Sequence, residues 1–201
     1  MKRTSRIPNL GGAKVFVLHR PHANVTAITR QLSAIGLDVT GCWPELPPEA
    51  LAADFVFFDA DLGFDEQFPW APGEAPMPVV ALIGSEAPGR IEWALSHKAD
   101  AQLLKPVGNS GVYSALLIAR QSFAARRQLA DQIATLEARV AERQTIVRAV
   151  TALSGQGIDD ERAYAQLRSL AMNWQVSVEE AARRVVAITE KEGGVDQSNR
   201  A

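Results

Sequence analysis

The side chains best suited to chemistry in this chain are ionisable groups that end or directly follow short apolar runs. His19 and Arg20 follow the first run, Asp59 ends the third, and Lys105 follows the fifth. In an open parallel sheet the carboxyl ends of the strands meet at one edge, where working groups gather. The sequence therefore predicts a cluster in which one carboxylate faces an imidazole, a guanidinium and an ammonium group.

Other arrangements that carry catalysis lack their partners in this sequence. The three histidines share no metal-ligand spacing, and Cys42 and Ser85 have no evident base. Gly11-Gly12 precedes an apolar run, whereas a dinucleotide-binding glycine loop follows a strand and opens a helix. The single cysteine excludes an internal disulfide framework and a cysteine-rich zinc site. We therefore expect no enzyme activity, no metal and no cofactor.

Five short apolar runs rich in β-branched and aromatic residues predict strands. They cover residues 13–18, 37–42, 54–59, 78–83 and 101–104. Apolar residues at three- and four-residue spacing predict a helix over 23–35, and a second helix is expected over 88–97. Three prolines within residues 68–76 disfavour a long helix between the third and fourth strands. Strands alternating with helix-sized segments indicate an α/β fold with a five-stranded parallel sheet and helices on both faces.

The order of these groups resembles the receiver domain of two-component signalling over roughly residues 13–125. The resemblance places Asp59 on the phosphoacceptor position and matches Lys105-Pro106 to the family's last motif. His19 and Arg20 replace the family's acidic pair, and Ile83 stands at its hydroxyl position. Phosphoryl transfer to a carboxylate needs Mg²⁺ and its carboxylate ligands, so this exchange removes metal ligands and adds repulsion.

These departures predict a pseudo-receiver over residues 13–112, flavodoxin-like in fold, that carries out no phosphotransfer. Arg20 and Lys105 are expected to neutralise Asp59 in a buried ion pair. Phosphorylation of Asp59 is the alternative.

The second part of the chain contains no proline after residue 106 and is typical of helix. Apolar residues recur there at alternating spacings of four and three, interrupted only by Arg143. They are Leu129, Ile133, Leu136, Val140 and Val147. This seam predicts a coiled-coil dimerisation helix over residues 113–142; a helix that lies on the core of its own domain is the alternative.

Glycines and capping residues divide the rest of the chain into shorter helices. Gly157 permits a helix end, and Asp159 is a good N-cap for the next helix. A capping box that begins at Ser177 starts a third helix, which we expect to end at Gly193-Gly194. The sequence thus predicts an all-α unit of three helices over residues 143–191.

Composition places the 201-residue chain among ordinary globular proteins, with 47% apolar and 22% charged residues. Residues 113–201 hold twelve Lys and Arg against eleven Asp and Glu, and eleven of those twelve bases are Arg, which suits planar contacts at interfaces. No apolar stretch approaches the roughly 20 residues that span a bilayer, and no signal peptide is evident, so we expect a cytoplasmic protein. Residues 1–12 are expected to form an N-terminal arm and residues 192–201 a mobile tail.

The predicted three-helix unit follows a pattern similar to the ANTAR domain, an RNA-binding module of transcription antiterminators. The matching residues are Arg143, Ile146, Ala149, Leu153, Gly157, Ala163, Leu167, Ala171, Met172, Ala181 and Ala182. Val150 stands where the family usually has Lys. Hairpin loops expose phosphates and unstacked bases, which Arg and aromatic side chains bind. The candidate RNA-contact residues are Arg143, Arg148, Tyr164, Arg168, Arg183 and Arg184.

The order of a degenerate receiver, a coiled coil and an ANTAR unit resembles antiterminators of the AmiR type. The resemblance implies a homodimer that binds paired stem-loops in a leader mRNA, disfavours the competing terminator hairpin and lets polymerase continue. It also implies control by a separate ligand-sensing protein in place of phosphorylation, and no binding of DNA. The alternatives are a phosphorylation-responsive regulator with RNA-binding output, and a protein-binding adaptor without RNA affinity.

Overall fold

The computed structural model describes residues 10–155 and 157–198. The chain divides into two compact units, Met1–Gln128 and Leu129–Ala201. We refer to them as the sheet unit and the helical unit. No helix in the described part of the chain combines the length and the apolar character needed to cross a membrane.

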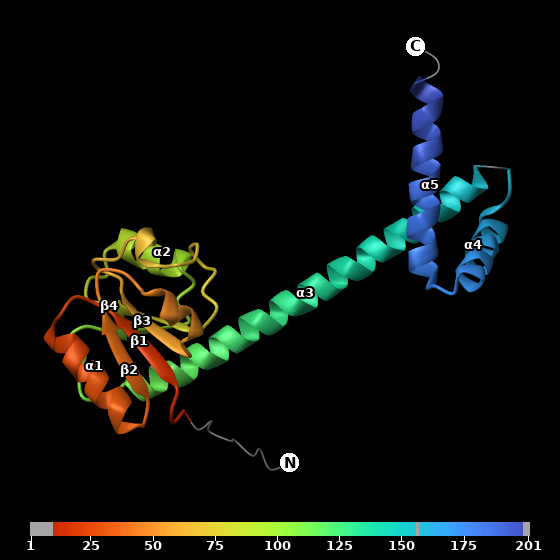
Figure 1. The fold of residues 1–201 in the computed structure, drawn as a ribbon. Coiled ribbons are helices and arrows are strands. Elements are labelled where there is room, and N and C mark those ends of the chain that lie inside the picture. Colours follow the sequence, from red (N-terminus) through yellow and green to blue (C-terminus); the bar gives the residue numbers. More distant parts are fainter. Residues whose placement is uncertain (1–9, 156, 199–201) are drawn as a thin grey trace. The chain divides into compact units, whose positions relative to one another are not determined.

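The sheet unit is built on five parallel strands in the order β2-β1-β3-β4-β5 (Figure 1). The strands are β1 (Lys14–Leu18), β2 (Asp38–Cys42), β3 (Phe55–Asp59), β4 (Val79–Ile83) and β5 (Ala101–Leu104). This confirms the predicted α/β fold with a flavodoxin-like strand order. The order reverses between β1 and β3, and in such sheets the crevice at the carboxyl ends of the reversing strands is where ligands bind.

Alternating side chains of the strands supply two separate apolar cores, one on each face of the sheet. On one face, Val17 and Phe57 pack against α1 (Ala23–Ala34) and against the first turns of α3 (Val112–Ser154). On the other face, the core includes Phe58 and is covered by α2 (Pro88–Ser96) and by loop segments. Because every residue of β3 and β4 is buried, both faces need such a cover.

The connection between β3 and β4 contains only one short 3-10 turn, η2 (Asp65–Gln67), as the three prolines within residues 68–76 predict. A second 3-10 turn, η1 (Pro48–Ala52), lies between β2 and β3. The buried Gln67 side chain holds this region together: its amide nitrogen donates to the Pro44 carbonyl oxygen at 2.6 Å, and its oxygen accepts from the Phe64 N–H at 3.2 Å.

The first turns of α3 belong to the core of the sheet unit. Val112, Leu116 and Ala119 are fully buried against the sheet. The helix that the sequence assigns to a coiled coil from residue 113 therefore starts as a packing element of the sheet, and the division between the two units falls at Gln128.

The helical unit consists of the last part of α3 with α4 (Asp160–Trp174) and α5 (Val178–Ser198). The predicted caps are present: the Asp159 carboxylate accepts from the Arg162 N–H at 2.8 Å, and the Ser177 hydroxyl accepts from the Glu180 N–H at 3.2 Å. The three helices enclose a small apolar core. Its fully buried members are Ala149, Ala163, Leu167, Ala181 and Ala182.

The predicted end of the last helix at Gly193-Gly194 is wrong, because α5 continues to Ser198. Glycine in a helix interior costs about 1 kcal/mol relative to alanine. Unlike proline, however, it keeps its backbone N–H donor, so two glycines weaken a helix without having to end it. The expectations for residues 1–9 and 199–201 lie outside the described residues.

Candidate functional site

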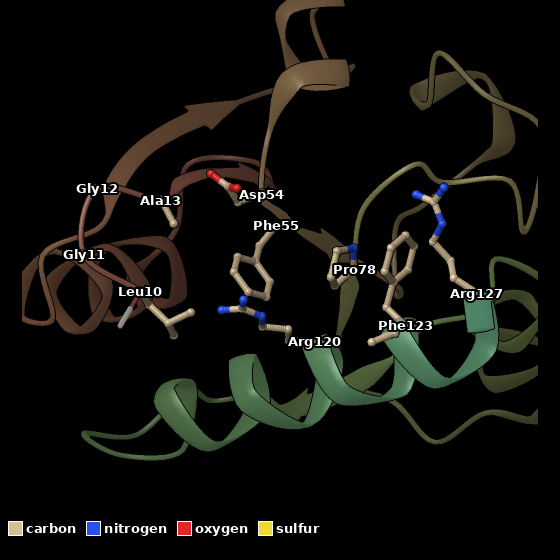
Figure 2. A pocket seen from close by; sticks show the side chains of 11 residues that line it. Leu10, Gly11, Gly12, Ala13, Asp54, Phe55, Pro78, Arg120, Phe123 and Arg127 are labelled. Atoms are coloured by element: carbon tan, nitrogen blue, oxygen red, sulfur yellow. The ribbon is translucent and has the colours of Figure 1, made fainter. Parts of the chain in front are cut away.

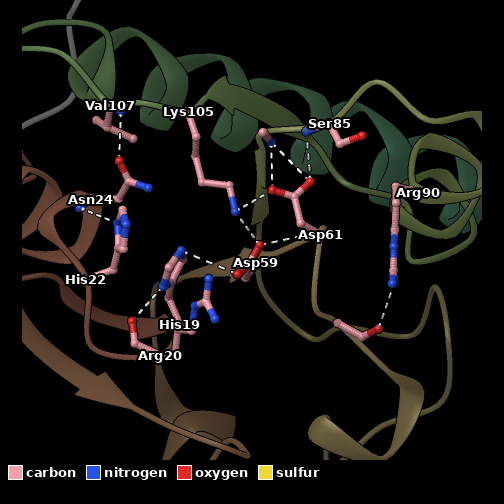
Figure 3. A network of polar contacts seen from close by, with 12 residues as sticks. His19, Arg20, His22, Asn24, Asp59, Asp61, Ser85, Arg90, Lys105 and Val107 are labelled. Carbon is pink, nitrogen blue, oxygen red and sulfur yellow. Dashed lines mark hydrogen bonds and ion pairs between the residues drawn. The ribbon is translucent and has the colours of Figure 1, made fainter.

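The four residues of the predicted ionic cluster line one cavity of about 470 Å³ at the carboxyl ends of the strands. His19 and Arg20 follow β1, Asp59 ends β3, and Lys105 follows β5. Figure 3 shows their polar contacts. The structure thus brings the four residues to one cavity, at the point where the strand order reverses.

Asp59 is almost completely buried, with 2% of its side chain exposed, and each of its carboxylate oxygens has a neighbour. Lys105 Nζ lies 2.5 Å from Oδ1, which also accepts the Asp61 N–H at 3.0 Å. His19 Nε2 lies 3.4 Å from Oδ2, while the other ring nitrogen of His19 contacts the Arg20 carbonyl oxygen at 2.6 Å. Asp59 is therefore held between the Lys105 ammonium group, the Asp61 backbone and the His19 ring.

The expectation that Arg20 neutralises Asp59 is not met. The groups that face the Asp59 carboxylate are Lys105 and His19, and the Arg20 side chain is exposed. Arg20 lines the same cavity, but none of the ion pairs among the described residues joins it to Asp59.

Asp61 belongs to the same network although the sequence reasoning missed it. Its carboxylate lies 2.6 Å from Lys105 Nζ and accepts hydrogen bonds from the N–H groups of Gly84 and Ser85, which follow β4. Desolvation raises its pKa, but the hydrogen bonds from Lys105, Ser85 and Gly84 outweigh this and hold the pKa of Asp61 below its ordinary value. The sequence feature that could have identified Asp61 is its position two residues after the end of a predicted strand.

The oxygen donors of this cavity do not fit a magnesium ion. Mg²⁺ in phosphoryl-transfer sites binds one or two carboxylates together with water and phosphate oxygens. Here the Lys105 ammonium contacts the carboxylates of both Asp59 and Asp61, so a protein cation already occupies the position between them. Among the described residues, no group of three or more His, Cys, Asp or Glu side chains is placed to hold a metal ion.

The sheet unit has a second cavity, of about 630 Å³, at the opposite edge of the sheet (Figure 2). The residues that precede β1, β3 and β4 line it, together with Arg120, Phe123 and Arg127 of α3. Arg127 stacks on the Phe123 ring, with 5.8 Å between the guanidinium carbon and the ring centroid. This cavity lies away from the ionic cluster, and the sequence pattern did not indicate it.

Cys42 shows no sign of being a nucleophile. Burial raises the pKa of its thiol to about 11. Because the thiolate is the reactive form, the side chain is predominantly protonated at neutral pH.

The six candidate RNA-contact residues are all exposed on the helical unit. Arg143 and Arg148 lie on α3, Tyr164 and Arg168 on α4, and Arg183 and Arg184 on α5. Tyr164 has 44% of its surface exposed, so it is not a filler of the small core.

Two of these arginines share one carboxylate. Arg183 lies 3.0 Å and Arg184 lies 3.1 Å from the carboxylate of Glu180, one turn earlier on α5. The guanidinium of Arg184 also stands over the ring of Trp174, 5.7 Å from its centroid. Trp174 is partly buried against the apolar core. This ring and Glu180 together hold Arg184 near the end of α4.

The predicted coiled-coil seam is exposed along α3. Its apolar side chains have 48–63% of their surface in contact with solvent: Leu129, Ile133, Leu136, Val140 and Val147. Their spacing forms an apolar stripe on the helix that no side chain in the described part of the chain covers.

Two protein families match the chain: "AmiR, N-terminal" over residues 13–120 and "ANTAR domain" over residues 134–186. No curated protein matches. Among solved structures, a signal receiver domain of a modulated diguanylate cyclase from Desulfovibrio desulfuricans is 16% identical, with 57% of this chain and 98% of that chain covered and a TM-score of 0.45. A response regulator from Thermotoga maritima is 19% identical, with coverages of 55% and 98% and a TM-score of 0.44.

Proposed function

The chain belongs to the AmiR family of ANTAR-domain regulators, and from this premise we propose that it is a transcription antitermination regulator that binds the stem-loops of a leader mRNA as a dimer. The observation that carries the proposal is the ANTAR match on a three-helix unit that exposes all six candidate contact residues. Since leader transcripts are made where the genome is read, the proposal places the protein in the cytoplasm.

The exposed side chains suit a folded RNA. Guanidinium groups bind phosphates through two parallel hydrogen bonds, and hairpin loops present unstacked bases that stack on aromatic rings and guanidinium planes. Tyr164 and Arg168 lie four residues apart, so they share one face of α4 and offer both kinds of contact side by side. The ion pairs of Arg183 and Arg184 with Glu180 are exposed, so phosphate can replace the carboxylate at low cost.

The seam on α3 supports a dimer in which the partner is a second copy of the chain. Large apolar side chains at alternating spacings of three and four residues pack against the same stripe of a facing helix. Dimerisation brings two ANTAR units together, and the second stem-loop then binds at the high effective concentration set by the first.

The sheet unit supports control by a partner protein in place of phosphorylation. The Asp59 carboxylate is buried in contact with Lys105 and His19, and the neighbouring donors do not fit the metal that phosphoryl transfer requires. We propose that a separate ligand-sensing protein binds the regulator and keeps it from RNA until the ligand is present.

A titration of the full chain with leader RNA tests the proposal. The probe is the transcript upstream of the neighbouring operon, containing two hairpins, and the control is an RNA of equal length and composition without hairpins. We expect preferential binding to the hairpins that weakens with salt, because each phosphate contact releases counterions. Equal affinity for both RNAs would contradict the proposal. Lack of affinity for either RNA would also contradict it and would favour a protein-binding adaptor.

Treatment with a small phosphodonor tests the remaining alternative, a regulator that responds to phosphorylation. We expect no gain of one phosphoryl group in the mass spectrum and no change in RNA affinity. A gain of mass that disappears in Asp59→Asn would establish the phosphorylation-responsive regulator instead.

A further inference from the structure

The cavity at the amino ends of the strands has one wall made by α3. Arg120, Phe123 and Arg127 form this wall, and their spacing of three and four residues places them on one face of the helix. Figure 2 shows this face turned toward Phe55, the first residue of β3, and Pro78, which precedes β4. All residues that line the cavity belong to the sheet unit.

The floor of this cavity is apolar. Leu10, Phe55 and Pro78 line it and are buried. Gly11 and Gly12, which precede β1, also line the cavity and have no side chain to fill it; a Cβ atom at Gly12 would meet no other heavy atom within 4 Å. A hollow with an apolar lining and a few polar groups is typical of sites that bind small molecules.

The guanidinium groups at this cavity are not used by the fold. In the part of the chain that the structure describes, no hydrogen bond or ion pair joins Arg120 or Arg127 to another residue, and Arg127 contacts the Phe123 ring by stacking alone. Arg126, the neighbour of Arg127, is different, because it pairs with the Asp100 carboxylate at 3.1 Å. Arg120 and Arg127 therefore keep their hydrogen-bond donors available for a ligand.

The charge at the cavity favours an anion. Its charged lining residues are Arg120, Arg127 and Asp54, so two positive groups stand against one negative group. The Asp54 carboxylate accepts the backbone N–H of Lys14 at 2.8 Å, which fixes it at the start of β1. An anion that approaches the two arginines therefore meets a net positive charge.

We propose that this cavity binds a small anion that carries a planar apolar group, the chemistry that nucleoside monophosphates and aromatic carboxylates share. The planar group packs against the rings of Phe55 and Phe123. The anionic group accepts hydrogen bonds from Arg120 and Arg127, since a guanidinium binds phosphate or carboxylate through two parallel bonds. The volume of about 630 Å³ lies within the range of small-molecule sites. This inference goes beyond the proposed function and does not depend on RNA binding.

Calorimetric titrations of the full-length protein test the inference with two probes, adenosine monophosphate and 1-naphthoate. We expect saturable binding of at least one probe with a Kd below about 1 mM, and the probe that binds identifies the source of the anion. Each half of that probe should bind at least about tenfold more weakly, because the site uses both the charge and the planar group. The half-ligands are phosphate and adenosine for the nucleotide, and acetate and 1-naphthalenemethanol for the carboxylate.

The double variant Arg120→Ala/Arg127→Ala locates the bound probe. It should weaken binding at least about tenfold, because it removes both charged donors. The control is Arg139→Ala/Arg162→Ala, which removes two exposed arginines outside the cavity, changes the net charge equally and should bind as the wild type does. In NMR spectra of the wild type, the amide signals of Gly11 and Gly12 should shift as the probe is added.

Two results would overturn the inference. One is the absence of saturable binding of either probe to the wild type at concentrations up to about 1 mM, a result that needs no variant to fold. The other is undiminished binding to an Arg120→Ala/Arg127→Ala protein with unchanged far-UV circular dichroism. That result would place the probe on another surface, such as the candidate RNA-contact residues.

Discussion

In the sheet unit, the side chain of Lys105 is 11% exposed and contacts two carboxylates, whereas in the helical unit Arg183 and Arg184 are 62% and 47% exposed and share one, Glu180. A buried ammonium group cannot be released without leaving unpaired charge, so its network is structural. Exposed pairs contribute little to stability and exchange readily. The difference separates charges that hold the fold from exposed charges, which the proposed RNA contact would use.

Apolar side chains, like the charged ones, are more exposed in the helical unit than in the sheet unit. Both faces of the sheet are covered within the sheet unit, while the seam of α3 is about half exposed. The sheet unit therefore buries its own apolar surface, whereas the helical unit exposes an apolar stripe that a second chain can cover.

The largest expected effect is on the buried network, from Lys105→Met. This change leaves Asp59 and Asp61 without their shared cation, and breaking a buried pair in this way costs about 3–5 kcal/mol. Urea unfolding followed by tryptophan fluorescence measures it, because three of the four tryptophans lie in the sheet unit.

Lys14→Met is the matched control, since Lys14 is exposed at the start of β1. Its free energy of unfolding should stay within about 0.5 kcal/mol of the wild type. An equally small effect from Lys105→Met would remove the distinction between structural and available charges.

The next effect is expected at the seam, from Leu136→Asp. A carboxylate there would be buried between the two helices of the dimer without a partner, so the dimer should dissociate. Loss of the second binding site should then lower the affinity for paired hairpins by about 100-fold. Sedimentation velocity and RNA titration measure the two effects.

Ala134→Asp adds the same charge two residues away on the exposed surface of the same helix, outside the seam. It should leave both dimerisation and RNA affinity unchanged. A Leu136→Asp protein that still sediments as a dimer would place the interface elsewhere.

The strands were predictable because their signal is local. Runs such as residues 54–59 and 78–83 are apolar throughout, as strands buried on both faces must be, and the structure confirms them to within one residue. The end of α5 was not predictable in this way. Two adjacent glycines alter helix stability by a modest amount, and whether the helix continues depends on the neighbouring turns.

The ionic cluster was predictable only in part. Asp59 and Lys105 stand at strand ends, so strand order alone brings them together. The placement of Asp61 depends on the backbone path of the loop after β3, and the choice between His19 and Arg20 as the partner of Asp59 depends on the backbone path after β1. Neither leaves a periodic signal in the sequence.

A smaller effect is expected from replacing two exposed arginines of the helical unit, in the double variant Arg148→Ala/Arg168→Ala. Helical content should be unchanged because alanine is a strong helix former. RNA affinity should fall by about tenfold, and the salt dependence should weaken by about 0.7 per lost phosphate contact on a single strand. Titrations at several salt concentrations measure both quantities.

Arg162→Ala is the control for this variant, because Arg162 is 81% exposed on α4 but is not among the candidate residues. It should retain the wild-type affinity. A double variant with intact helicity and unchanged affinity would exclude these two arginines from the RNA contact surface.

The smallest effect concerns Asp65, an intermediate case in which an exposed carboxylate contacts one buried and one partly buried side chain. It contacts His97 Nε2 at 3.0 Å and accepts from Trp93 Nε1 at 2.7 Å, and these hydrogen bonds, that of His97 first, hold the pKa of Asp65 below its ordinary value. A lowered pKa in the folded state stabilises the protein at neutral pH, and this contribution is lost as the pH falls through the folded-state pKa. Asp65→Asn keeps the acceptor oxygen but removes the charge, so its Tm should lie below that of the wild type at pH 7 and the difference should shrink by about pH 3. Asp38→Asn, at an exposed position without these donors, should show no such convergence of Tm values. Equal behaviour of the two variants would show that exposure alone decides how much a carboxylate of the sheet unit contributes to stability.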